Sequence, residues 1–498
     1  MANKRKKVAL VKISNSSVSW KSPPLGLLYV GGALRRNGYD VKIYHVMSSQ
    51  ISHAAKEIVK ENPLFAGFSV LTGQTIQACA DLSKRLKESG GIPIVWGNAH
   101  PSLLSEQCLG EDYIDYVVIG EGEETSVELA NALSEGADVS SIHGLGYKND
   151  GQIIVNPRRP PIKDMDKYPM DWSLIEDRME QYLNPYWDRK RMLHTVSSRG
   201  CPYDCAFCYN AKFSCRRWNC HSAEFVIDQV QWLQKKFNID AVSWDDDNFF
   251  TQKERAFKIV EKLSLPYYCE SRAEYINDEF AERLSETDCR LILMGMESGS
   301  DRILRSINKG CTVEDNLNAV RNLAKYKNVC ISGSFMFGLP TETYDEFQKT
   351  IDLIIKMLKI KPQMTFTAGF YMPYPGTELY DLVKTMGFYS PEKTEDWERM
   401  DRWRNDFPIS WADWLTGRGA LNARKNIILM ATLYRYNIPL LKQWVNRRVR
   451  LNSLKSMPDL EFLIWLRELF TGEQDNLLQK IGQWIVQRKT QTIWGIKS

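Results

Sequence analysis

Short apolar runs alternate with amphipathic helical patterns over the first 140 residues of the chain. The helical patterns at residues 25–36 and 74–88 each end at a pair of residues containing glycine, a common stop signal. This alternation predicts a doubly wound α/β domain, flavodoxin- or Rossmann-like, whose ligands bind at the carboxyl ends of parallel strands. The predicted strands are residues 8–13, 41–44, 65–70, 94–96 and 116–119.

The same alternation returns between residues 191 and 385. Repeated strand–helix units predict a barrel or partial barrel with its chemistry at the carboxyl ends of the strands. The six predicted strands are residues 193–198, 241–244, 267–270, 291–296, 331–337 and 365–370, and the helices between them include 223–236, 278–285, 313–325 and 344–357.

The remaining segments have a different character. Residues 143–190 are a predicted linker, in which Asn149-Asp150-Gly151 forms a hairpin turn before an irregular, proline-bearing stretch. The predicted domains are therefore 1–142, the linker 143–190, a barrel at 191–385 and a helical region at 386–498.

The C-terminal region is rich in tryptophan and basic residues. Eight of the fifteen tryptophans follow residue 390, and residues 421–498 hold thirteen Lys and Arg against five Asp and Glu. Its helical, amphipathic runs predict a cap over the barrel mouth. The alternative is a cap that also holds an anionic or aromatic-binding substrate, or touches a membrane surface.

Composition excludes several classes of protein. The net charge of the 498 residues is only +4, which does not indicate nucleic-acid binding. No run of 18 apolar residues exists, so no transmembrane segment is predicted. Eleven cysteines without framework spacing indicate reduced thiols in a cytoplasmic protein.

Three cysteines, Cys201, Cys205 and Cys208, follow the first predicted barrel strand at a C-x3-C-x2-C spacing. Thiolates hold iron–sulfur clusters, and three of them leave one iron of a four-iron cube open to another ligand. Gly200 lets the backbone approach the cluster closely, and Pro202 fixes the chain as it turns.

Two other interpretations of the three cysteines are possible. Inert buried thiols would have no reason to fall at ligand spacing. A zinc site would need further ligands, for which Cys215, Cys220 and His221 are nearest, but no second C-x2-C pair follows. Cys215 and Cys220 are themselves expected to be ordinary thiols, since two cysteines make a poor cluster site.

Residues 197–210 resemble the cluster motif of the radical S-adenosylmethionine (SAM) enzymes. In that family the amino and carboxylate groups of SAM chelate the open iron, and an electron from the cluster splits SAM to give a 5′-deoxyadenosyl radical. The resemblance implies a 4Fe–4S cluster on Cys201, Cys205 and Cys208 in a partial barrel of six units. It also implies an electron donor of the reduced flavodoxin or ferredoxin type.

SAM needs carboxylates for its amino group and ribose, a cation near its carboxylate and backbone groups for adenine. Residues of these types stand at the predicted strand ends. The resemblance implies SAM contacts from Phe207, Asp247, Arg272, Glu297, Ser298 and Gly338. Asp245 and Asp246 could instead belong to a solvated loop or cap a helix.

The loops of the N-terminal domain resemble those of the cobalamin-binding domain in one radical SAM subfamily. The resemblance implies cobalamin contacts from Pro24, Leu25, Gly26, Ser69, Thr72, Gly97, His100, Gly120, Glu121 and Gly122. None of the six histidines lies in a D-x-H-x-x-G loop, so we expect cobalamin without a protein histidine on cobalt. For His100 we favour a loop histidine near a corrin amide over an axial ligand. The lack of an axial nitrogen should ease reduction to Co(I).

The resemblance covers about residues 8–380 and implies a cobalamin-dependent radical SAM methyltransferase acting on an unactivated carbon. In such an enzyme one SAM methylates cobalamin and a second gives the radical. One alternative keeps the cofactors in a cyclase, ring-contracting or oxygenating enzyme. Another is a cobalamin- or redox-sensing binding protein, against which the strand-end carboxylates argue. A small-molecule, lipid, sugar or peptide substrate is compatible with the sequence.

Overall fold

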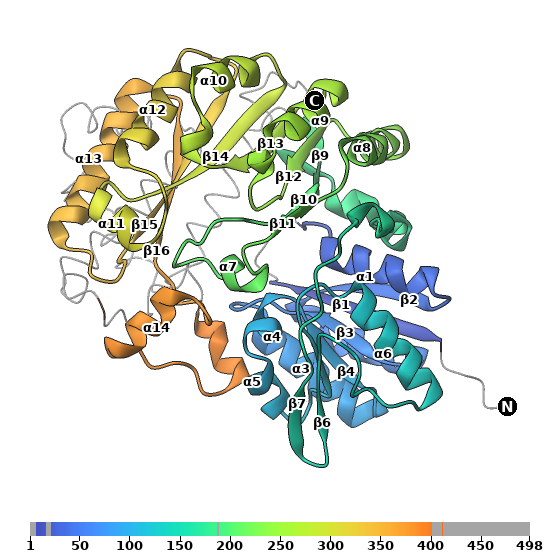
Figure 1. Cartoon of the computed structure of the whole chain (residues 1–498). Helices are drawn as coiled ribbons and strands as arrows, with labels where there is room; N and C mark the ends of the chain where they lie inside the picture. Colours follow the sequence, from blue (N-terminus) through green and yellow to red (C-terminus); the bar gives the residue numbers. More distant parts are fainter. Residues whose placement is uncertain (1–5, 16–20, 187–188, 401–410, 412–498) are drawn as a thin grey trace, which may run out of the picture.

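The computed structural model describes residues 6–15, 21–186, 189–400 and 411. Within these residues the chain forms two seven-stranded sheets and a two-stranded hairpin (Figure 1). No helix in this part of the chain is long and apolar enough to cross a membrane. Of the predicted helical cap at residues 386–498, the structure describes only residues 386–400 and Trp411.

The first sheet has the order β2-β1-β3-β4-β5-β6-β7. Strands β1 to β5 are parallel, and their order 2-1-3-4-5 is that of a flavodoxin-like sheet. The predicted doubly wound domain is thus confirmed. The strands are β1 (Lys7–Ser14), β2 (Asp40–Met47), β3 (Ala66–Ser69), β4 (Ile94–Gly97), β5 (Tyr116–Val118), β6 (Leu145–Asn149) and β7 (Gln152–Val155).

Helices cover both faces of this sheet (Figure 1). Strand β1 is buried over nearly its whole length, as expected for a parallel strand covered on both faces. The helices are α1 (Leu25–Arg36), α2 (Ile51–Glu61), α3 (Ile76–Gly90), α4 (Ala99–Leu103), α5 (Ser105–Gly110) and α6 (Glu123–Glu135). The predicted hairpin at Asn149-Asp150-Gly151 exists, and its strands β6 and β7 extend the first sheet.

The second sheet has the order β16-β15-β14-β13-β12-β9-β8. Six of its strands are parallel, which confirms the predicted partial barrel of six units, and β8 joins the edge antiparallel. The strands are β8 (Asn184–Tyr186), β9 (Arg189–Thr195), β12 (Ala241–Trp244), β13 (Tyr267–Ser271), β14 (Cys289–Glu297), β15 (Cys330–Phe337) and β16 (Thr365–Phe370).

Helices lie along the outside of the curled second sheet (Figure 1). They are α8 (Ala223–Phe237), α9 (Lys253–Leu263), α10 (Asp278–Ser285), α11 (Asp301–Ser306), α12 (Val313–Ala324) and α13 (Tyr344–Ile360). Helix α14 (Glu378–Thr385) follows β16 and lies apart from this row, towards the N-terminal domain. Helix α13 begins with a capping box between Thr343 and Glu346, which explains its sharp start. Short 3₁₀ segments, including Trp172–Tyr182 in the predicted linker, complete the fold.

Two connections join the domains beyond the linker. The segment that follows α14 returns to the N-terminal domain, where Trp397 donates its indole N–H to Gln107 at 2.7 Å and Lys84 pairs with Glu395 at 2.7 Å. The hairpin of β10 (Ser198–Gly200) and β11 (Trp218–Cys220), with α7 (Asn210–Phe213) between its strands, also lies between the two sheets. The predicted domain boundaries stay predictions.

Candidate active site

The three motif cysteines lie in a loop that the β10–β11 hairpin closes at its base. Ser198–Gly200 pairs antiparallel with Trp218–Cys220, so the chain enters and leaves the loop at one place. Gly200 has φ +79°, and a Cβ atom added there would lie 2.1 Å from the carbonyl oxygen of Arg217. Glycine is therefore required for the hairpin to close this tightly.

Two aspartates after β12 support the same hairpin. Asp246 is buried and accepts hydrogen bonds from the backbone N–H (2.9 Å) and hydroxyl (2.8 Å) of Ser197, so it is neither a solvated loop residue nor a cap. Asp247 accepts from the N–H of Gly200 at 2.9 Å but keeps an exposed surface. Surrounding protein atoms raise the pKa of both carboxyl groups. Of these two carboxylates, only that of Asp247 is accessible to a ligand.

The three thiols lie on one loop and are buried or partly buried. Cys205 is buried, Cys201 and Cys208 are partly buried, and the N–H of Cys208 donates to the carbonyl of Cys205 at 2.9 Å. Burial, with smaller contributions from Cys205 and Cys201, raises the pKa of Cys208 to about 12. Such thiols fit a metal centre, because a metal replaces the protons that burial otherwise retains.

A single-ion site is a poorer fit. In the described part of the chain, no three His, Cys, Asp or Glu side chains converge as the ligands of one metal ion would. Cys215 is exposed on the loop, and Cys220 lies at the end of β11, where it does not join the three motif thiols. The arrangement favours a multi-iron cluster over the zinc alternative.

Arg272, at the end of β13, is directed at one of these thiols. Its Nη1 lies 3.5 Å from the Sγ of Cys205, and its guanidinium stacks 3.6 Å from the ring centre of Tyr203. The other guanidinium N–H groups donate to Glu274 and to the backbone carbonyl of Lys309. The Arg272 side chain is buried next to the cluster loop, and its N–H groups already have acceptors in Glu274, Cys205 and Lys309.

Glu297, at the end of β14, is paired with a buried lysine. Lys309 Nζ lies 2.8 Å from Glu297 Oε1. Burial alone would lower the pKa of Lys309, but Glu297 and Cys205 raise it above its ordinary value. Glu297 has φ +56° and lies where the register between β14 and β15 shifts, which turns its carboxylate inward. Phe207 is partly buried, with its ring centre 5.9 Å from Lys309 Nζ.

The two other predicted SAM contacts lie at neighbouring strand ends. Ser298 is buried, with its Oγ 3.4 Å from Thr350 Oγ1. Gly338, after β15, has φ +67°; its N–H donates to Glu342 at 2.6 Å, and its carbonyl accepts from the indole of Trp411 at 2.8 Å. Burial raises the pKa of Glu342 to about 8. The predicted SAM residues therefore gather around the carboxyl ends of β12 to β15.

The predicted cobalamin residues follow four strands of the first sheet at their carboxyl ends. Ser69 Oγ accepts from the side-chain amide of Asn98 at 3.0 Å, and the N–H of Gly120 donates to Ser102 Oγ at 3.0 Å. These contacts join the loops after β3, β4 and β5 at one edge of the sheet. Pro24, Leu25 and Gly26 follow β1 and begin α1, Thr72 follows β3, Gly97 ends β4, and Glu121 and Gly122 precede α6.

His100 is fully buried in this edge. Its Nδ1 lies 3.0 Å from Thr72 Oγ1, and its ring meets the edge of Trp397 at 5.8 Å between centroids. Burial lowers its pKa to about 3, so the imidazole is neutral. Among the described residues its Nε2 has no hydrogen-bond partner. A ring with no exposed surface supports a packing role rather than an axial one.

The carboxyl edges of the two sheets meet. Arg199, on β10, donates to Glu123 at the start of α6 at 2.5 Å and to Glu121 in the loop after β5 at 3.2 Å. Arg158 of the linker donates to the backbone carbonyls of Lys212 and Phe213 on α7, within the loop that carries the three cysteines. The candidate cluster loop and the candidate cobalamin edge therefore lie next to each other.

Two residues of this site could not be identified from the motifs. Arg199 immediately precedes the glycine and cysteine of the motif, but its partners lie 76 and 78 positions earlier. Lys309 stands in no motif, and only its positive charge between the predicted strand 291–296 and the predicted helix 313–325 could have drawn attention to it.

Comparisons with known proteins agree with this arrangement. Residues 195–354 match the model of the radical SAM superfamily, and residues 11–130 match that of the B12 binding domain. An uncharacterized methyltransferase of Pyrococcus horikoshii is 33% identical over 377 residues, covering 74% of this chain and 79% of the relative. An anaerobic magnesium-protoporphyrin IX monomethyl ester cyclase of Rubrivivax gelatinosus is 26% identical over 385 residues, 74% of this chain and 68% of the cyclase.

One solved structure shows the same fold over most of the chain. It is the radical SAM methyltransferase TsrM from Kitasatospora setae, with cobalamin and a [4Fe-4S] cluster bound. Its TM-score is 0.65 at 18% identity, and the match covers 84% of this chain and 89% of TsrM.

Proposed function

The chain belongs to the radical SAM superfamily, with a B12 binding domain preceding the barrel, and from this we propose that it is a cobalamin-dependent radical SAM methyltransferase acting on an unactivated carbon. The observation that carries the proposal is the contact between the two carboxyl edges. Arg199 lies two residues before Cys201 and bonds Glu123 of the B12 binding domain at 2.5 Å. Two cofactors held on these edges would share one reaction space.

The residues present fit the cofactors. Cys201, Cys205 and Cys208 would hold a 4Fe–4S cluster, because one buried and two partly buried thiols lie on a single loop fixed by Gly200. Asp247 offers an accessible carboxylate to SAM. Together the bound groups would supply a 5′-deoxyadenosyl radical from SAM and the cluster, and a methyl group carried on cobalamin.

The chain's own part is to bind, orient and exclude water. Phe207 offers an aromatic face on the cluster loop for adenine. The backbone groups of Gly338 are already bonded to Glu342 and Trp411, so its predicted contact with SAM would need one of these bonds to open. The positive charge of Lys309 offsets the negative charge of the Glu297 carboxylate beside these groups. Arg272 would stabilise negative charge on the thiolate of Cys205, because its Nη1 faces that sulfur.

The B12 binding edge would take the corrin through its small and polar residues. Gly26 leaves open space, since a Cβ added there meets nothing within 4 Å. The loops at Ser69, Thr72, Gly97 and Gly120 are joined by hydrogen bonds of 3.0 Å, which would hold a pre-formed surface. No histidine would coordinate cobalt, because the ring of His100 is wholly buried.

Delivery of electrons would need a partner. We propose a reduced flavodoxin or ferredoxin type of donor, acting in the cytoplasm, where low-potential donors and reduced thiols coexist.

A second candidate function is a cyclase that uses the same cofactors without methyl transfer. The cyclase relative at 26% identity favours it, and the methyltransferase relative at 33% identity favours methyl transfer.

The deciding experiment uses SAM labelled with deuterium in its methyl group. Reconstituted protein is incubated anaerobically with candidate small-molecule, lipid and peptide substrates, and products are analysed by mass spectrometry. A methyltransferase gives product heavier by the labelled methyl group, with S-adenosylhomocysteine and 5′-deoxyadenosine in equal amounts. Product that forms with 5′-deoxyadenosine but without label would overturn methyl transfer and favour the cyclase.

A further inference from the structure

Arg199 links the cysteine loop to the N-terminal domain through three side chains. Its Nη2 lies 2.5 Å from Glu123 and its Nη1 3.2 Å from Glu121, while its guanidinium stacks 3.9 Å from the ring centre of Tyr29 on α1. Glu123 and Tyr29 are each only 2% exposed. A cation enclosed by two carboxylates and an aromatic face is held far more firmly than a surface ion pair.

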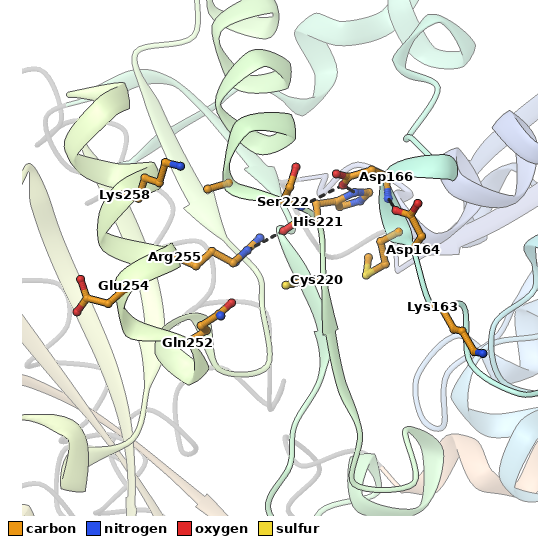
Figure 2. Close-up of a pocket in the computed structure, with 12 residues that line it drawn as sticks. Lys163, Asp164, Asp166, Cys220, His221, Ser222, Gln252, Glu254, Arg255 and Lys258 are labelled. Atoms are coloured by element: carbon orange, nitrogen blue, oxygen red, sulfur yellow. Dashed lines mark hydrogen bonds and ion pairs between the residues drawn. The ribbon is translucent and has the colours of Figure 1, made fainter.

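Tyr29 continues the connection to the other side of the hairpin. Its hydroxyl lies 2.9 Å from His221 Nε2, and His221 Nδ1 lies 3.0 Å from Asp166 of the linker. Figure 2 shows His221 and Asp166 directed at each other, and Arg255 reaching the carbonyl of His221. Asp166, His221 and Arg255 also line a hollow of about 520 Å³ beside them.

Ile162 of the linker bonds through its backbone to both the loop after β5 and the cysteine hairpin. The N–H of Ile162 donates to Glu121 at 2.7 Å, and the carbonyl of Ile162 accepts from the side-chain amide of Asn219 on β11. Asn219 faces Arg199 across the hairpin. The loop after β5, the linker and the cysteine hairpin are thus joined in one ring of hydrogen bonds, which also uses both carboxylate oxygens of Glu121.

We propose that Arg199 is a positioning residue that fixes the cluster loop relative to the cobalamin-binding edge, and so sets the distance between the two cofactors. The proposal rests on the proposed function for the identity of those cofactors. Arg199 would act through its contacts with Glu121, Glu123 and Tyr29. A small error in such a distance affects the rate strongly, because the reacting groups must meet in a defined geometry.

The matched control is Arg159, a linker arginine that pairs with Glu124 and Glu128 on α6. It joins linker and domain but makes no contact with the cysteine hairpin in these interactions. Variants Arg199→Met, Arg199→Lys, Glu123→Gln and Arg159→Met are therefore compared in the full chain. Arg199→Lys retains the positive charge but cannot bond both carboxylates with one planar group. Its change relative to the wild type should therefore be smaller than that of Arg199→Met, but not zero.

The first measurement is pulsed electron paramagnetic resonance of the protein loaded with Co(II) cobalamin and a reduced cluster. The dipolar coupling between the two centres reports their distance. We expect one narrow distance distribution in the wild type and in Arg159→Met, and a broadened or shifted one in Arg199→Met and Glu123→Gln. An unchanged distribution in both of the latter variants overturns the proposal.

The second measurement is hydrogen exchange of the cofactor-free chain. Arg199→Met should speed exchange of the backbone N–H groups of β10, β11 and residues 120–123 by about tenfold, whereas Arg159→Met should leave β10 and β11 unchanged. Equal exchange of the hairpin in Arg199→Met and wild type overturns the proposal. If the wild type retains no cobalamin, the proposed function fails while this second measurement still tests Arg199.

Discussion

The guanidinium Nη1 of Arg272 lies 3.5 Å from the Sγ of Cys205, on the side of the cysteine loop that faces β13. Tyr203, two residues before Cys205, stacks on the same guanidinium at 3.6 Å. Lys309 is buried nearby and its pKa responds to Cys205. Two cations, Arg272 and Lys309, thus act on one candidate cluster thiolate.

We predict that Arg272→Met lowers the reduction potential of the cluster. Reduction adds negative charge, which the Arg272 donor and cation stabilise, and hydrogen bonds to cluster sulfur are a known determinant of potential. If the reduced cluster loses about 1.4 kcal/mol of stabilisation, which is within the range of one charged hydrogen bond, its one-electron reduction potential falls by about 60 mV. The measurement is a redox titration of the reconstituted protein followed by electron paramagnetic resonance.

Arg283 provides the control for this titration. It is an arginine of α10 that pairs with Glu254 and Glu261 at the surface, away from the thiols. Arg283→Met should leave the potential unchanged. A potential for Arg272→Met equal to that of the wild type would show that the short distance to Cys205 has no electrostatic consequence.

A second prediction concerns Gly200. A Cβ at this position would overlap the carbonyl oxygen of Arg217, and φ +79° is unfavourable for alanine. We expect Gly200→Ala to open the hairpin and to lose most of the iron, although every cysteine is retained. Iron analysis after anaerobic reconstitution checks this against about four irons for the wild type.

Gly110→Ala is the matched control for this substitution, because a Cβ there meets nothing within 4 Å. It should bind iron like the wild type. Full iron occupancy in Gly200→Ala would mean that the hairpin can relax around the added methyl group and does not fix the cysteine loop.

Much of the fold was predictable because local periodicity and local stop signals agree. Helix α1 spans Leu25–Arg36 and β12 spans Ala241–Trp244, as the apolar patterns predict. Strands β10 and β11 were not predicted as a pair, since each has three residues and no apolar run. Their pairing depends on Asp246, Asp247 and Gly200, contacts that join segments about 47 positions apart.

The types of residue in the candidate site could be predicted from the sequence, but the groups that these residues contact could not. A cation at the end of β13 follows from the sequence, yet nothing local shows that one N–H of Arg272 would face Cys205. Glu121 was predicted to contact cobalamin, and the structure shows its oxygens engaged by Ile162 and Arg199. Such pairings depend on how two domains meet, which periodicity does not encode. The assignment of individual residues to contacts with SAM or cobalamin stays a prediction.

The third prediction is that cobalamin binds without a histidine on cobalt. The ring of His100 has no exposed surface and is held between Thr72 and Trp397. The Co(II) electron paramagnetic resonance spectrum should therefore lack nitrogen superhyperfine splitting, and His100→Phe should leave it unchanged. A nitrogen triplet that disappears in His100→Phe would assign His100 as the axial ligand.

The last prediction concerns the pH dependence of stability. His45 is buried between Ser14 and Tyr182, with ring nitrogens 2.7 Å and 3.0 Å from their hydroxyl oxygens. Burial, followed by the positive charges of Lys12 and other cations, lowers its pKa to about 3. In the unfolded chain a histidine titrates near 6.5. Below pH 6.5 the unfolded state therefore binds a proton that the folded state does not, and stability falls as the pH is lowered towards 3.

The expected slope is about 1.4 kcal/mol per pH unit for this one group. In urea unfolding of the cofactor-free chain at pH 7.5, 6.5 and 5.5, His45→Gln should lose stability less steeply than the wild type between pH 6.5 and 5.5. Tyr182→Phe removes one hydroxyl partner but leaves His45 buried, so it should keep the wild-type slope at a lower overall stability. Parallel curves for His45→Gln and the wild type would show that His45 is protonated in the folded protein, because only then would the folded and unfolded states take up the same proton over this range.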